Sequence, residues 1–132
     1  MSKRRFEFTV YGKLPTMNEE IEATKRHWSA YSKHKEGFTT LVALYAKQQL
    51  KGVQITGQCA IVCRWYVRSR AQDADNISFA TKYILDGLQW AGTIKNDNLK
   101  TVNGGLLHQF AIDKDNPRVE VVILENQKLS FE

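Results

Sequence analysis

The chain has 132 residues, of which 42% are hydrophobic and 25% are charged. This length suits one domain, over residues 1–132, and this composition is typical of a soluble globular protein with one modest core, which excludes disordered and collagen-like chains. No apolar run approaches the roughly 18 residues of a membrane span, and the first residues lead into an alternating strand rather than a signal peptide. We therefore expect a cytoplasmic protein with no membrane partner.

The net charge of +5 is unevenly divided along the chain. Residues 1–70 hold 13 Lys and Arg against 5 Asp and Glu, a net +8, whereas residues 71–132 hold 6 against 9, a net −3. A basic half beside an acidic half favours a surface that attracts a polyanion next to a cluster that holds a cation. Nucleic acid with a metal ion is the simplest interpretation, although surface charge often serves only solubility.

The two cysteines, Cys59 and Cys63, share one face of an expected strand, so we interpret them as reduced core residues. A zinc site needs four Cys or His ligands at short paired spacings, and His27, His34 and His108 do not supply them.

Residues 5–11 alternate apolar and polar side chains, which predicts a strand with one buried face. A long helical region is expected to follow over residues 18–51, divided near Gly37. The clearest strand of the sequence is expected over residues 58–70, and its outer face becomes basic toward its end.

Downstream of that strand, an apolar stripe at helical spacing predicts a helix that ends at Gly92. Residues 99–103 could form a short strand, and two strands around residues 113–117 read as a hairpin. The elements together predict an α+β fold in the order β-α-β-α-β-β, with a mixed sheet of about four strands packed with helices.

Three aspartates frame the second helical region. Asp73 and Asp75 stand where a strand gives way to a helix, and Asp97 follows the far end of that helix. Strand, helix and return could bring the three together, and close carboxylates repel each other unless a cation lies between them. Hard oxygen ligands suit Mg²⁺, which serves phosphodiester hydrolysis. Alternatively, Asp75 caps a helix that opens at Asn76 or Ile77.

Lys82 and Asp86 lie one helical turn apart. A surface ion pair is one interpretation, worth only about 0.3 to 0.5 kcal/mol. A lysine near the carboxylates could instead contact the scissile phosphate and stabilise charge in the transition state. The spacing alone does not decide between the two.

Several motifs in order resemble the RusA-type Holliday junction resolvases, particularly their phage and prophage members. The resemblance lies in three segments that occur in the family's order: Asp73-Ala74-Asp75-Asn76, Lys82-Tyr83-Ile84-Leu85-Asp86-Gly87-Leu88, and Gly92 followed by Asn96-Asp97. It extends outward to Leu14-Pro15-Thr16-Met17-Asn18-Glu19 and to the stretch from Asp113 to Val121, and so spans nearly the whole chain.

The resemblance implies a homodimer that binds a four-way DNA junction and makes paired nicks with Mg²⁺, for which Mn²⁺ could substitute. Asp73, Asp75 and Asp97 match the family's metal-binding acids, and Lys82 matches its catalytic lysine. The spacing from Asn76 to Lys82 is longer here by close to one helical turn, which keeps the lysine on its face. Asn76 and Asp86 are expected to support the site, in a bacterial or phage-infected cell.

Basic residues of the first half are the candidates for DNA phosphate contacts. They are Lys25, Arg26, Lys33, Lys35, Arg64, Arg68 and Arg70.

Three other functions stay open. The runner-up is a branched-DNA-binding protein of the same fold without nuclease activity. A small interaction module whose basic face meets an acidic protein has only the charge in its favour. A metal nuclease that acts on flaps or single strands has the same chemistry, because carboxylates specify phosphodiester hydrolysis and not the shape of the DNA.

Overall fold

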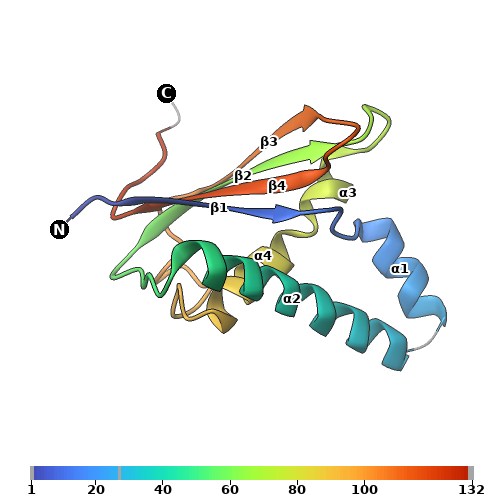
Figure 1. Cartoon of the computed structure of the whole chain (residues 1–132), viewed down its shortest axis with the longest axis horizontal. Coiled ribbons are helices and arrows are strands. Elements are labelled where there is room, and N and C mark those ends of the chain that lie inside the picture. Colours follow the sequence, from blue (N-terminus) through green and yellow to red (C-terminus); the bar gives the residue numbers. More distant parts are fainter. Residues whose placement is uncertain (1, 27, 131–132) are drawn as a thin grey trace.

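The computed structural model describes residues 2–26 and 28–130. The elements in chain order are β1 (Arg5–Tyr11), α1 (Met17–Arg26), α2 (Trp28–Leu50), β2 (Cys59–Val67), α3 (Ala74–Ser78), α4 (Thr81–Trp90), β3 (Leu106–Ile112) and β4 (Arg118–Glu125). The four strands form one mixed sheet in the order β1-β4-β2-β3. Helices α2 and α4 cover one face of this sheet, and α1 extends away from it (Figure 1). The predicted α+β fold with a four-stranded mixed sheet is therefore confirmed.

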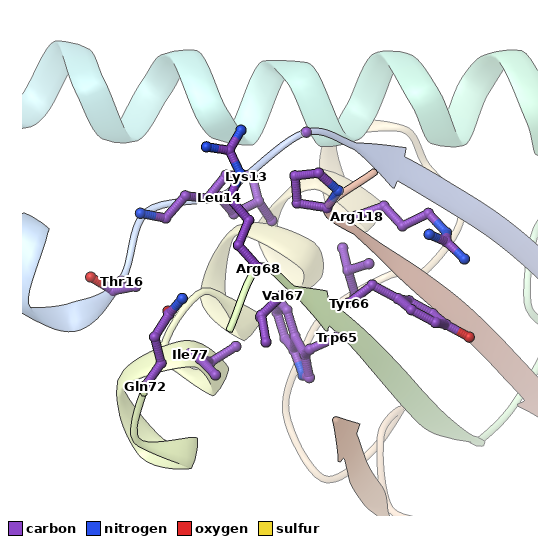
Figure 2. Close-up of a pocket in the computed structure, with 13 residues that line it drawn as sticks. Lys13, Leu14, Thr16, Trp65, Tyr66, Val67, Arg68, Gln72, Ile77 and Arg118 are labelled. Atoms are coloured by element: carbon purple, nitrogen blue, oxygen red, sulfur yellow. The ribbon is translucent and has the colours of Figure 1, made fainter. Parts of the chain in front are cut away.

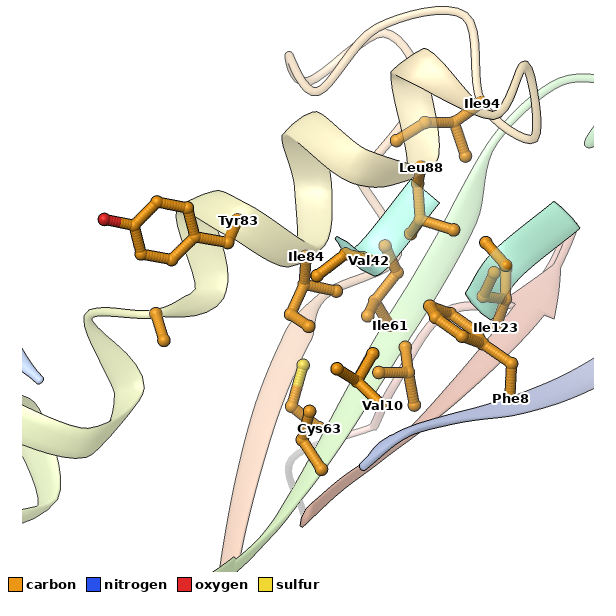
Figure 3. Packing of buried hydrophobic residues seen from close by; sticks show 14 of the residues in the cluster. Phe8, Val10, Val42, Ile61, Cys63, Tyr83, Ile84, Leu88, Ile94 and Ile123 are labelled. Carbon is orange, nitrogen blue, oxygen red and sulfur yellow. The ribbon is translucent and has the colours of Figure 1, made fainter. Parts of the chain in front are cut away.

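The core forms between the inner face of the sheet and the two covering helices. Phe8, Ile61 and Ile123 point from three strands toward Val42 of α2 and Leu88 of α4 (Figure 3). All five side chains are almost completely buried. The alternation that predicted β1 arises here, because every second residue of β1 faces this core.

The C-terminal hairpin prediction is wrong in topology, although both strands exist. β3 pairs in parallel with β2. The loop after β3 then crosses the end of β2, and β4 lies antiparallel between β2 and β1. Asp113 anchors this crossing, since its backbone N–H donates to the Val67 carbonyl at 2.9 Å. Arg118 then closes the loop through its Nη1, which donates to the Asp113 carboxylate at 2.8 Å.

Three helix and strand boundaries also differ from the prediction. The first helical region divides between α1 and α2, and Gly37 lies inside α2. The second region consists of two helices, α3 and α4, that meet at Phe79 and Ala80. Residues 99–103 form a turn rather than a strand, because the backbone N–H groups of Thr101 and Val102 both bond the Asn98 carbonyl.

The cysteine interpretation is confirmed, since Cys59 and Cys63 are free and fully buried. Burial raises the pKa of the Cys59 thiol to about 11 and that of Cys63 to about 12, which keeps both protonated. Among the described helices, none is both long and apolar enough to cross a bilayer.

Candidate metal and nucleic-acid site

Asp73 and Asp75 lie together at the turn from the end of β2 into α3. Asp73 is the residue before α3 and Asp75 is in its first turn, where the positive end of the helix dipole favours negative charge. The alternative in which Asp75 caps a helix that opens at Asn76 or Ile77 is wrong. Helix α3 begins at Ala74, so Asp75 lies inside its first turn. Both carboxylates are exposed, and no described residue forms a hydrogen bond or ion pair with either.

Lys82 lies at the start of α4, at the same end of the molecule as these acids. The ion pair with Asp86, one of the two interpretations of the spacing, does not form; the Lys82 ammonium lies 5.8 Å from the centre of the Phe79 ring instead. Asp86 borders a shallow surface hollow together with Lys35 and Trp90, away from α3.

Asn76 holds the acidic turn against the rest of the fold. Its side-chain oxygen accepts a hydrogen bond from the backbone N–H of Asn18 at 2.9 Å, which joins α3 to the start of α1. Helix α1 is itself capped, because the Thr16 hydroxyl accepts from the Glu19 N–H while the Glu19 carboxylate accepts from the Thr16 N–H. Asn76 therefore fixes the position of the helix that carries Asp75.

Asp97 lies at the opposite end of the sheet from Asp73 and Asp75. Its loop is tied to the beginning of β2, since the Cys59 N–H donates to the Thr101 carbonyl at 2.7 Å. The acidic turn follows the end of β2, and nine residues at about 3.3 Å each put the two ends of this strand on the order of 25 Å apart. Within residues 2–26 and 28–130, no three His, Cys, Asp or Glu side chains are arranged to hold one metal ion.

The expected DNA-contact residues divide between β2 with the loop that follows it and the helices α1 and α2. Arg68 and Arg70 are exposed in the loop that leads to Asp73. Lys25 is exposed on α1, where it lies 3.5 Å from Glu22. Lys33 is exposed and Lys35 half-buried in the first half of α2, which extends past the edge of the sheet beside α1 (Figure 1).

Of the two remaining candidates, only Arg64 can be placed. Arg64 lies on the open face of the sheet, where Glu7 is 3.8 Å from it. The side chain of Arg26 lies outside the described part of the structure.

A pocket beside the acidic turn was missed by the sequence analysis. It has a cavity volume of about 100 Å³ and lies between the turn after β1, the end of β2 and α3 (Figure 2). Three basic residues line it: Lys13, Arg68 and Arg118. Lys13 and Arg118 are already paired with carboxylates, Lys13 with Glu19 at 2.9 Å. Of these three residues, the sequence analysis had named only Arg68, as a candidate for DNA contact.

The comparisons with known proteins give no family for this chain: none of the family models matches it, and no curated protein matches it. The resemblance to the RusA-type resolvases therefore depends on the motif residues of this sequence alone.

Proposed function

We propose that this chain is a divalent-metal-dependent DNA endonuclease that cuts four-way junctions. The observation that carries the proposal is the composition of one end of the molecule. Asp73 and Asp75 meet there at an exposed strand-to-helix turn, with Lys82 on the next helix and Arg68 and Arg70 on the loop before them. Acids that can hold a cation thus adjoin cations that can hold a phosphate.

The donor set at this turn fits Mg²⁺. The ion binds oxygen ligands and commonly uses one or two carboxylates, completing its shell with water and substrate phosphate. Asp73 and Asp75 have oxygens that no described residue occupies, so both would hold the ion. When bound, Mg²⁺ supplies a Lewis acid that polarises the phosphoryl oxygens and lowers the pKa of bound water.

The protein's own residues supply position and charge. Arg68 and Arg70 would hold the DNA backbone beside the acids, and such contacts orient a strand without reading its sequence. Lys82 would neutralise charge that develops on the phosphate as the bond breaks. Its partner in the described part is the neutral face of Phe79 and not a carboxylate, which leaves its positive charge available.

The homodimer belongs to the same proposal, and the edge strand β3 supports it. Among the described strands, β3 pairs with β2 alone, and Leu106, Leu107, Phe110 and Ile112 are each between 42% and 48% exposed. Leu106–Ile112 contains no Lys, Arg, Asp, Glu or Pro, the residues that usually protect a free edge from pairing. An edge of this kind is self-complementary when two copies pair antiparallel about a two-fold axis.

Antiparallel pairing of two β3 strands would also bring the distant Asp97 of one copy close to the acidic turn of the other. The acidic turn lies beside the C-terminal end of β3, because one surface hollow is bordered by Ala74, Phe110 and Ile112. In such a pair, the N-terminal end of the second copy's β3 lies beside the C-terminal end of the first copy's β3. The Asp97 loop is at the N-terminal end of β2 and β3, so the second copy's loop comes to the acidic turn of the first. We therefore propose that Asp97 acts in the site of the opposite subunit.

The decisive test compares the wild type with Asp73→Asn on a labelled four-way junction and a matched linear duplex, with Mg²⁺ or with EDTA. Paired, Mg²⁺-dependent nicks in the junction are expected from the wild type. Asp73→Asn should slow them by about a thousandfold or more while junction binding survives, because several kcal/mol of metal stabilisation are lost.

Asp115→Asn is the matched control, because Asp115 is an exposed carboxylate in the loop that crosses the end of β2. It should cleave like the wild type. Binding of the junction without cleavage by the wild type would favour the non-catalytic DNA-binding protein. Equal cleavage of the linear duplex would refute the junction specificity.

A further inference from the structure

The pocket beside the acidic turn has no role in the proposed nuclease reaction. Its walls are apolar, formed by Leu14 from the turn after β1, Trp65 and Val67 from the end of β2, and Ile77 from α3 (Figure 2). Leu14, Trp65 and Ile77 are all at least nine-tenths buried. The basic residues of the lining do not make this space an anion site, because Lys13 and Arg118 are already paired with carboxylates and Arg68 is exposed to solvent.

The size of the cavity restricts what can enter. Its volume is about 100 Å³, on the scale of the engineered cavity of about 150 Å³ that takes up a benzene ring. A single six-membered ring, as in a pyrimidine base, can enter, whereas a bicyclic purine or a whole nucleotide with its sugar and phosphate cannot. The Trp65 indole is held in place at the wall, because its Nε1–H donates to His108 Nδ1 at 3.0 Å.

The rim of the pocket is polar where the walls are not. Gln72 is half-buried at the rim, and within the described residues its amide has no hydrogen-bond partner. An amide of this kind offers both a donor and an acceptor to the edge of a base. Arg68, also at the rim, is exposed and has no described carboxylate partner, so it can hold a phosphate outside the pocket.

The pocket and the acidic turn belong to one fixed corner of the fold. Gln72 directly precedes Asp73 in the chain, and Ile77 of the wall is in the same short helix as Asp75. The bond between the Asn18 N–H and Asn76 ties this helix to the turn that carries Leu14. A group seated in the pocket is therefore placed relative to the two carboxylates.

From these features we propose that the pocket receives one pyrimidine base, unstacked from the DNA strand that lies at Asp73 and Asp75. The base would insert between the apolar walls, Gln72 would bond its edge, and Arg68 would contact the phosphate that remains outside. This inference rests on the proposed function only in needing DNA at that end of the molecule. Branched DNA suits it, because a base at a branch point costs less to unstack than one inside a duplex.

The test uses four-way junctions that carry a single 2-aminopurine stacked directly on a pyrimidine, with this pair placed in turn at each position next to the branch. The 2-aminopurine becomes strongly fluorescent when the neighbouring pyrimidine that quenches it leaves the stack. With EDTA present, so that no strand is cut, wild-type protein should raise the fluorescence several-fold at one position and leave the others nearly unchanged. Cleavage of the same junctions is then measured separately with Mg²⁺.

Two variants connect the signal to the pocket. Leu14→Trp should fill the cavity and abolish the fluorescence rise while the junction still binds. Gln72→Leu keeps the volume and should weaken the rise, which covers the case in which Leu14→Trp fails to fold. The matched control is Leu44→Trp, an identical substitution at a side chain of α2 that is 60% exposed and lies outside the pocket. It should behave like the wild type.

The outcomes separate the two proposals. A wild type that cuts junctions but unstacks no base refutes the pocket proposal and leaves the nuclease proposal intact. Unstacking that Leu14→Trp abolishes, without any cleavage, supports the pocket and refutes the nuclease. A rise that survives in both pocket variants, or a wild type that binds no junction, overturns the pocket proposal.

Discussion

At the scale of single residues, Glu125 is the charged group on which the fold depends most. It is only 1% exposed, and its carboxylate accepts hydrogen bonds from Arg4 Nη2 and from the Thr56 backbone N–H, both at 2.8 Å. The Arg4 guanidinium, with the Thr56 N–H, holds the pKa of this carboxyl down at about 2. The interaction joins the start of the chain to its end and to the segment before β2.

Glu125→Gln should lower the free energy of unfolding at pH 7 by about 1.5 to 3 kcal/mol, since charge-assisted hydrogen bonds are lost. The folded-state pKa lies below its ordinary value of 4.5, so the stabilisation is present above that value and disappears as the pH falls toward about 2. Urea unfolding at pH 7 and at pH 3 measures this difference. Wild type and variant should approach each other at the lower pH.

The control for this prediction is Glu7→Gln, at an exposed ion pair with Arg5. Exposed pairs contribute little, so the change should stay below about 1 kcal/mol. Equal losses from both variants would contradict the role assigned to Glu125.

Sequence reasoning reaches some of these residues and misses others for a physical reason. Asp73 and Asp75 could be located because a strand end followed by a helix start is a local pattern, and the structure has that pattern. Arg4 and Glu125 are 121 residues apart, so no local spacing indicates their pairing. The separation of Asp97 from the other acids has the same origin, since it depends on how α4 lies along the sheet.

At the scale of elements, the contact between α2 and α4 depends on Gly87. A Cβ atom at this position would lie 2.5 Å from Val42 Cγ1, closer than side chains can approach. Gly87→Ala should therefore lower stability by about 1 to 3 kcal/mol, as overpacking does, despite the better helix propensity of alanine. The urea midpoint measures the loss.

Gly37→Ala provides the matched comparison within a helix. Gly37 is in α2, and a Cβ there would have no neighbour within 4 Å. Alanine should stabilise the protein by about 0.5 to 1 kcal/mol, because it lowers the entropy cost of the helix. A loss of stability at Gly37 as large as that at Gly87 would refute the packing argument.

The strands themselves were more predictable than their pairing. Alternation located β1, in which every second residue is buried, and β2, which is buried on both faces at its start and becomes more exposed only toward its end. The hairpin prediction failed because the segment around Asp113 looks like a tight turn in sequence, whereas its bond to the Val67 carbonyl directs the chain across β2. The boundary at Gly37 failed because helix packing tolerates a glycine that the sequence pattern treats as a break.

At the scale of the whole molecule, the charge of the chain is arranged along the sheet. Arg68 and Arg70 lie at the end that carries Asp73 and Asp75, and α2, which carries Lys33 and Lys35 in its first half, begins on the same side (Figure 1). The uneven charge along the sequence indicated a polyanion and a cation, but it could not reveal that Asp97 would lie at the opposite end. The proposed pairing of a second copy through β3 would bring Asp97 of one subunit to the acidic turn of the other.

A subunit-mixing experiment tests that arrangement. Asp73→Asn and Asp97→Asn should each be inactive alone, because every site of either homodimer lacks one acid. If each site takes Asp73 from one subunit and Asp97 from the other, a mixed dimer has one intact site and one site that lacks both acids.

An equal mixture of the two variants, unfolded and refolded together, should then recover about a quarter of the wild-type nicking. Half of the dimers are mixed, and one of the two sites in each mixed dimer is intact. The recovered product should be single rather than paired nicks. If all the acids of a site belong to one subunit, no mixed dimer contains an intact site, and the mixture should stay as inactive as its components.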